Sequence, residues 1–422
     1  MTPKNYDLTF HYFRAFAIVS VMLTHMWVGP VLAGSEDAAK LQDSLRLCLF
    51  HSATIYFVFI SGYLFDFVNR RKGQFSPLRF YKSKIVNVFC PYFILSLLLL
   101  AAGWISHHWF GYDIPFINDG TPVASLWDVL RCLAYGSASL VPYWYIPFIM
   151  TGFSVGPLIF HLPTGLLQKI LLPASVLPLM VPRLLVSPLR NLCFFVPIFL
   201  MGVYCARNRD ACMAFIRRHL SAIRVTAVLT SLLIVADHYF GSFMPNIEGA
   251  YSVQKLCIGS WVLELLEGMD REVLALDFLA RYSFPLFFLH AIFQAPLFQV
   301  LGAALPGQVF TIANLTVTVE IALCILCILG IKKVMGKRSR YLAKGKPAAG
   351  SALTVLEDAA GNDGTGAAGK AVPVFFFRQG TRWRRTKKGG HGPPSMFRVT
   401  PVACCGAVPA SLRRAHAGVL PS

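Results

Sequence analysis

Long apolar segments recur along the chain up to about residue 340. Each is about 20 residues long, enough for a helix to cross the roughly 30 Å hydrocarbon core of a bilayer. The pattern predicts an all-α, polytopic membrane bundle of about ten transmembrane helices. The fifth segment is short and proline-rich, which predicts a broken or re-entrant helix. The approximate limits of the segments are 10–32, 47–68, 86–106, 141–160, 167–182, 190–206, 223–240, 252–267, 282–302 and 309–331.

Basic residues gather in alternate connections between these segments. By the positive-inside rule, the basic connections face the cytoplasm, and an even number of spans places both termini there. The basic set is Arg70, Arg71, Lys72, Arg79, Lys82, Lys84, Arg207, Arg209, Arg217, Arg218, Arg271, Arg281, Lys332, Lys333, Lys337, Arg338 and Arg340.

Composition agrees with a membrane protein. The chain has 422 residues, 55% hydrophobic and only 14% charged, which is too little charge to cover a soluble protein of this size. The net charge of +19 arises largely from the basic connections and the C-terminal tail, so no nucleic-acid partner is expected. The first apolar segment has no small-residue cleavage site and is expected to remain as a helix.

The cysteines are scattered singly through apolar segments and are expected to act as small apolar residues. Cys324 and Cys327 form a CxxC pair, but it lies inside a predicted span and has no second pair. We therefore predict no metal site there.

The composition changes after Tyr341. We expect a transmembrane domain at 1–341 and a low-complexity basic tail at 342–422. The tail is Gly-, Ala- and Pro-rich and then strongly basic around 382–388. It is expected to be disordered, or else to be an out-of-frame extension, and a nucleic-acid-binding arm has the least support.

The first apolar segment carries two ionisable residues, Arg14 and His25. A helix turns about 100° per residue, so residues eleven positions apart lie on one stripe, about 16 Å apart along the axis. Ionisable groups inside a span are costly and usually face a cavity or a partner. This pair is the first candidate for chemistry.

Further patterns accompany the pair, in a fixed order along the chain. Together with it they resemble the acyltransferase-3 family of integral-membrane O-acyltransferases, over about residues 6–335. The family typically has Arg-Gly-x-Ala with a His eleven residues after the Arg, Phe-Phe-x-x-Ser-Gly, a basic segment before Pro-Tyr, a mid-chain Trp-Phe-Leu motif, and Tyr-Ser followed by Leu-His. The corresponding segments here are 13–18 with Thr24-His25, 56–64, 80–84 with Cys90-Pro91-Tyr92, Pro142-Tyr143-Trp144-Tyr145-Ile146, and Tyr282-Ser283-Phe284 with Leu289-His290.

Three positions depart from the family pattern. Ala15 stands for the usual Gly, a small change that favours the helix. Lys84 and Asn87 stand where family members tend to carry two arginines. Because lysine cannot bind a phosphate through two parallel hydrogen bonds, Lys82 or the cluster 70–72 would have to compensate in binding the donor.

The resemblance implies transfer of an acyl group, usually acetyl, from a coenzyme A thioester to a hydroxyl of a carbohydrate or lipid-linked glycan. Acyl-CoA is then a co-substrate, no cofactor is bound permanently, and the protein is a multi-pass component of the inner (plasma) membrane. The long outer connection at about 107–140, with Asp113, Asp119 and Asp128, would form the rim of the acceptor site.

The chemistry of this reaction suggests roles for two residues. A sugar hydroxyl is a poor nucleophile at neutral pH and needs a general base, and histidine has a reference pKa near 6.5, which suits that task. We expect His25 to be that base and Arg14 to hold a phosphate or the thioester end of the donor. For Arg14, snorkelling to the cytoplasmic interface is the alternative.

Other residues complete the expected site. The donor-binding set is Arg14, Ser61, Lys82 and Lys84, with the Ser61 hydroxyl as a donor to the developing oxyanion. Alternatively, Ser61 and Gly62 are a small-residue packing contact. Trp144 and Tyr145 are expected to contact the acceptor or to be interfacial anchors.

Three ionisable residues elsewhere are also candidates. His290 is predicted as a substrate-binding residue, with a helix-packing role as the alternative. His51 would approach His25, and Glu320 would pair with an arginine or histidine in a structural role.

Two other functions remain open at this point. The first is a transporter of a glycan intermediate or a small solute, which would show an internal repeat and paired half-helices. No convincing repeat is visible. The second, a non-catalytic scaffold, gives no purpose to Arg14 and His25.

Overall fold

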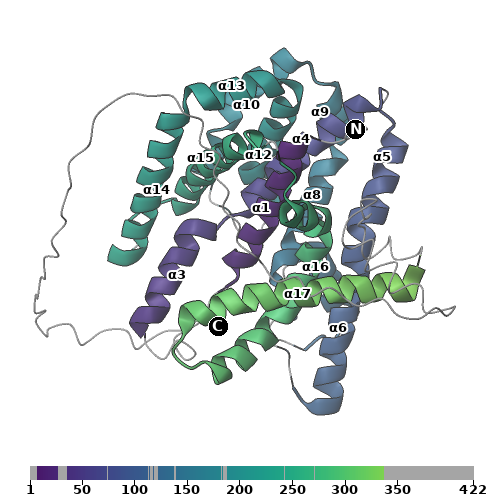
Figure 1. The fold of residues 1–422 in the computed structure, drawn as a ribbon. Coiled ribbons are helices and arrows are strands. Elements are labelled where there is room, and N and C mark those ends of the chain that lie inside the picture. Colours follow the sequence, from purple (N-terminus) through teal and green to yellow (C-terminus); the bar gives the residue numbers. More distant parts are fainter. Residues whose placement is uncertain are drawn as a thin grey trace, which may run out of the picture. The chain divides into compact units, whose positions relative to one another are not determined.

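The computed structural model describes residues 7–26, 36–73, 75–112, 114, 117, 122–136, 139–181, 183, 188–241, 243–269 and 271–336. All regular elements in these ranges are helices, and none is a strand (Figure 1). Six of the described segments are long and apolar enough to cross a membrane: Glu36–Arg71, Pro77–Phe110, Arg190–Arg207, Leu220–Phe240, Leu274–Gln294 and Val309–Val334. The predicted all-α membrane fold is confirmed at this level, whereas the count of ten spans and the cytoplasmic termini stay predictions.

Every predicted apolar segment overlaps a helix. The unbroken helices are α1 (Leu8–Thr24), α4 (Thr54–Arg71), α6 (Cys90–Phe110), α12 (Pro188–Arg207), α14 (Leu220–Phe240), α15 (Ile247–Glu267), α16 (Leu274–Ala304) and α17 (Val309–Met335). The proline-rich fifth segment is broken, as expected, into α10 (Thr164–Ala174) and α11 (Leu177–Met180). The fourth is also interrupted, into η3 (Val141–Trp144), α8 (Tyr145–Ser154) and α9 (Gly156–His161).

Additional helices fill the predicted connections. They are α3 (Glu36–Phe50), α5 (Pro77–Lys84), α7 (Leu126–Tyr135) and α13 (Arg209–Arg218), with a π-helical turn η1 (Ile85–Phe89) joining α5 to α6. In the long outer connection, Asp128 closes the capping box of α7 with Ser125, and these hydrogen bonds hold the pKa of its carboxyl below the ordinary value. Asp113 and Asp119 lie outside the described residues, as does the predicted tail at 342–422.

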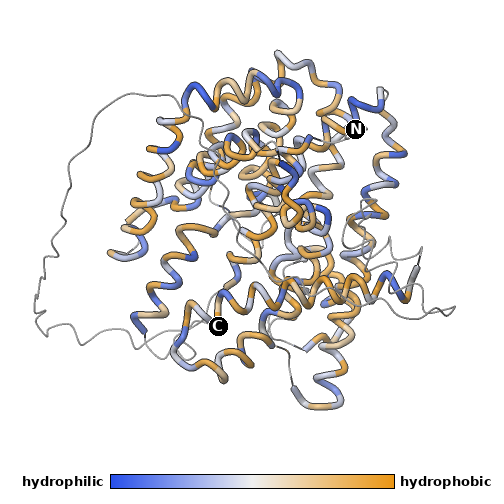
Figure 2. The backbone as a smooth tube through the Cα atoms, viewed as in Figure 1, coloured by the Kyte–Doolittle hydropathy of each residue, from blue (hydrophilic) through white to orange (hydrophobic). Residues whose placement is uncertain are grey.

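The outer helices present apolar side chains outward. Figure 2 shows apolar residues along most of α6 and α17, with polar residues near their C-terminal ends. Leu98 on α6, Leu232 on α14 and Leu326 on α17 are all exposed. Apolar surface of this extent is stable only against lipid, which agrees with a membrane protein.

Two glycines set the closest helix crossing in the described bundle, between α4 and α12. A methyl group on Gly62 would lie 2.0 Å from the carbonyl oxygen of Phe199, and one on Gly202 would lie 2.1 Å from that of Phe59. The two backbones therefore touch at both points, in a small-residue contact typical of membrane helices. Gly62 is thus a packing residue.

Charged residues fasten the start of α1 and the ends of α4 and α12. Asp7 is the N-cap of α1 and accepts hydrogen bonds from the backbone N–H of Thr9, from the Tyr63 hydroxyl and from Arg209. Asp66 on α4 is fully buried and pairs with Arg70 and Arg207. These contacts fix the start of α1 against α4 and α13.

We expect Gly62→Ala and Gly202→Ala each to destabilise the fold by roughly 1–3 kcal/mol or more, because the added methyl meets backbone that cannot move aside. The measurement is the apparent Tm of the purified protein in detergent. Gly330→Ala on α17 is the matched control, since a methyl group there meets nothing within 4 Å. Equal melting of all three variants would contradict the close crossing.

Candidate functional site

A cavity of about 260 Å³ lies beside α1, between α4, α8, α16 and the π-helical turn η1. We call it the inner cavity. It collects three of the four residues predicted to bind the donor, and it combines an apolar wall with four basic or amide side chains. Its lining includes Arg14, Phe57, Ser61, Leu64, Lys84, Asn87, Tyr145, Arg281, Ser283 and Phe287.

Arg14 points into the bundle. Its Nη2 donates to the Ser283 hydroxyl at 2.9 Å, and Ser283 in turn donates to the carbonyl of Ala280 at 2.9 Å. The side chain is therefore held against α16 at the inner cavity and does not snorkel to the interface. Ser283 belongs to the Tyr-Ser motif that the sequence singled out.

Ser61 and its neighbour Gly62 face different partners. The Ser61 hydroxyl lies 2.9 Å from the hydroxyl of Tyr145 and lines the inner cavity, whereas Gly62 packs on α12. Successive helical residues are about 100° apart, so one dipeptide serves both purposes. The packing interpretation holds for Gly62, and the donor-binding role of Ser61 stays a prediction.

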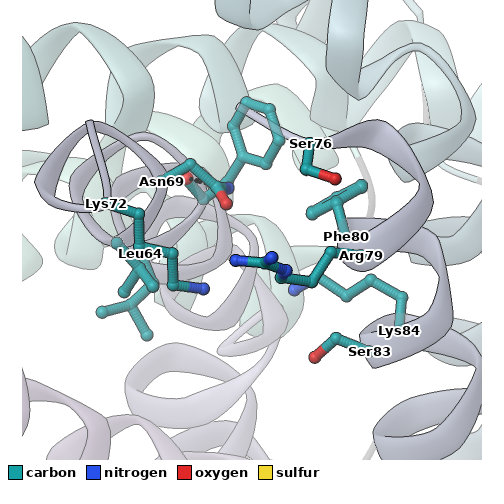
Figure 3. Close-up of a pocket in the computed structure, with 10 residues that line it drawn as sticks. Leu64, Asn69, Lys72, Ser76, Arg79, Phe80, Ser83 and Lys84 are labelled. Carbon is teal, nitrogen blue, oxygen red and sulfur yellow. Dashed lines mark hydrogen bonds between the residues drawn. The ribbon is translucent and has the colours of Figure 1, made fainter. Parts of the chain in front are cut away.

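A second cavity, also of about 260 Å³, opens between α4 and α5 (Figure 3). We call it the basic cavity. Figure 3 shows Arg79 extending from α5 toward Lys72 at the end of α4. Leu64 and Lys84 line both cavities, so the two adjoin. The Lys84 ammonium lies over the ring of Phe153, 4.0 Å from its centroid, which holds it at the junction.

Other predicted donor residues are placed differently. Lys82 is exposed and lines neither cavity, so it does not join Lys84 among the residues of the candidate site. Asn87 lines the inner cavity from the π-helical turn, and its side-chain amide donates to the Ser83 backbone carbonyl. Arg79 adds positive charge to the basic cavity and Arg281 adds it to the inner cavity. From the sequence, these two residues served only to predict which connections face the cytoplasm.

His25 lies at the end of α1. The helix stops at Thr24 and His25 is its C-cap, not a residue in mid-span as the apolar pattern predicted. Its ring centroid is 5.5 Å from that of His290 on α16. His290 of the late Leu-His motif therefore lies next to His25 of the first motif.

The tautomer of His290 follows from its contacts. Its Nδ1 lies 2.9 Å from the carbonyl of Phe287, which can only accept, so Nδ1 carries the proton. The Nε2 lone pair is buried and has no hydrogen-bond partner within the described residues. Phe287 also lines the inner cavity, and its ring centroid is 6.1 Å from that of His290. Phe287 thus lies next to both the inner cavity and His290, and His290 lies next to His25.

The mid-chain aromatics are interior residues. Trp144 stacks on Phe195 with centroids 5.5 Å apart, and Trp144 and Tyr145 are both buried by protein. Neither faces lipid as an interfacial anchor would. Tyr145 reaches the inner cavity and Trp144 does not.

The remaining candidates differ in their surroundings. His51 Nε2 is hydrogen-bonded to the Glu248 carboxylate at 2.9 Å, and Arg183 contacts both side chains. Glu320 is fully buried, and neither carboxyl oxygen has a partner among the described residues, so the expected ion pair is not seen. No cluster of three potential metal ligands occurs in the described ranges.

The comparison with protein-family models matches the acyltransferase domain of the acyltransferase-3 family over residues 7–331. The chain belongs to the acyltransferase-3 family. The match covers every helix described above except the last residues of α17, and with it both cavities and both histidines. Family membership implies an acyltransferase embedded in a membrane. No curated protein and no solved structure matches the chain.

Proposed function

We propose that this acyltransferase moves an acyl group, acetyl in the simplest case, from acyl-CoA to a hydroxyl of a carbohydrate or lipid-linked glycan at the inner (plasma) membrane. The observation that carries the proposal is the pair of adjoining cavities. They join a basic opening between α4 and α5 to Arg14 in the bundle interior.

The donor's charge fits the basic cavity. Lys72, Arg79 and Lys84 offer positive charge, and Ser76 and Ser83 offer hydroxyl groups, to the phosphates of coenzyme A. The uncharged pantetheine arm then runs past Leu64 into the inner cavity. Arg14 and Ser61 hydrogen-bond the amide groups of the arm there.

The reacting end must pass Phe287 to reach His25. A neutral imidazole nitrogen of His25 takes the proton of the acceptor hydroxyl as its oxygen attacks the thioester carbonyl. The tetrahedral oxyanion collapses, the C–S bond breaks, and the thiolate leaves with the proton that His25 returns. The neutral His290 Nε2 accepts a hydrogen bond from the acceptor or from His25 during this transfer.

We expect His25→Ala to lower acyl transfer by roughly 10²–10⁴-fold, the usual contribution of a general base. The assay follows label from radiolabelled acetyl-CoA into cell-envelope glycan, with membranes containing equal amounts of each variant. His219→Ala, at an exposed histidine, is the control. Undiminished labelling by His25→Ala would exclude it as the base, and solute flux without acyl-CoA would favour a transporter.

A second prediction separates the two lysines of α5. Lys84→Gln should raise KM for acyl-CoA roughly 10- to 100-fold, because a charge-assisted hydrogen bond to phosphate is worth about 1.5–3 kcal/mol. Lys82→Gln makes the same chemical change outside both cavities and should leave KM unchanged. If the two variants were equally impaired, the donor path drawn here would be wrong.

A further inference from the structure

The last residues of α1 lie against α3 and α16 and are buried or partly buried. The carbonyls of Met22 and Leu23 accept the backbone N–H groups of His25 and Met26, at 3.1 and 3.2 Å. Helix α1 ends at Thr24, so the carbonyls of Thr24, His25 and Met26 follow its last regular turn.

Side chains from two other helices supply the missing donors. Arg46 Nη1 on α3 donates to the Thr24 carbonyl at 2.5 Å, and Gln294 Nε2 on α16 donates to the carbonyl of His25 itself. Gln42 Nε2 on α3 donates to the Met26 carbonyl. Each of three consecutive carbonyls thus receives one side-chain donor.

The arrangement is centred on His25. A residue's backbone fixes the direction of its Cα–Cβ bond, so holding the carbonyls on both sides fixes the position from which the imidazole extends. Arg46 is itself held by Asp43, with its Nε 2.9 Å from the carboxylate. Gln294 lies one helical turn beyond His290, so α16 positions both histidines at once.

We propose that Gln294 and Arg46 are positioning residues for His25, which hold the C-terminal turn of α1 so that the imidazole meets the acceptor hydroxyl. The inference rests on the proposed function, because it presumes that His25 is the base. Neither side chain lines the inner or the basic cavity, so both act at the end of α1 and not on the donor. A misplacement of about 1 Å at a reacting group can cost on the order of 100-fold in rate.

The test uses Gln294→Leu, which removes the donor at nearly constant volume, in the full-length protein reconstituted in nanodiscs. We expect kcat for glycan acylation to fall about 10- to 100-fold. KM for acetyl-CoA should not change, because Arg14 and both cavities are intact. Gln299→Leu makes the same change at an exposed position of α16 and should leave kcat unchanged. A second variant, Arg46→Lys, keeps the positive charge but loses the planar guanidinium group with its several donors. It should likewise lower kcat without changing KM.

A double-mutant cycle with His25→Ala distinguishes positioning from a general loss of structure. If Gln294 acts through His25, Gln294→Leu has no further effect on the residual rate of His25→Ala. Equal fold losses in both backgrounds, a parallel rise in KM, or a wild-type kcat in Gln294→Leu would each overturn the positioning role. A wild-type rate in His25→Ala alone would instead overturn the proposed base. Where the residual rate of His25→Ala is too low to measure, the positioning role is tested by whether Gln294→Leu lowers kcat without raising KM for acetyl-CoA.

Discussion

Helix ends that lie inside a membrane protein constrain the rest of this structure, because their carbonyl groups have no water to bind. The ends of α1 and α3 solve this problem together. Arg46 of α3 donates to Thr24 of α1, and the Thr24 hydroxyl lies 2.5 Å from the carbonyl of Phe50 at the end of α3. The buried Lys255 donates to two further carbonyls of α3, those of Cys48 and Leu49. The groups that satisfy these helix ends also hold the turn that carries His25.

The packing of α4 links stability to the site in a second way. Gly62 and Gly202 bring α4 and α12 into backbone contact, and this fixes the rotation of α4 about its axis. With that rotation, Ser61 and Leu64 face the inner cavity and Asp66 meets Arg207. A larger residue at the crossing would turn or displace α4. The inner cavity therefore depends on the contact that the opposite face of α4 makes with α12.

The sequence predicts the helical segments well because hydropathy depends on local composition, and lipid selects that composition directly. It also singles out Arg14, Ser61 and Lys84, which line the same cavity. The sequence alone could not show that Lys84 lines a cavity and Lys82 does not, because this depends on which face α5 turns toward α4. Arg46 and Gln294 gave no signal at all. Their role depends on where α1 ends, and the unbroken apolar run predicted that it continues past His25.

The division of polarity along the proposed donor path follows from the cost of burying charge. Phosphates carried into an apolar bundle would lose their hydration at great cost, whereas the pantetheine arm is neutral and needs only a few hydrogen bonds. The basic cavity has Lys72 and Arg79 besides the shared Lys84, whereas the inner cavity has Arg14 and Arg281 within a lining that is mostly apolar or aromatic. His25 lies beyond Phe287, about three helical turns from Arg14. In this arrangement the nucleotide stays at the basic opening, and only the thioester end has to enter the membrane interior.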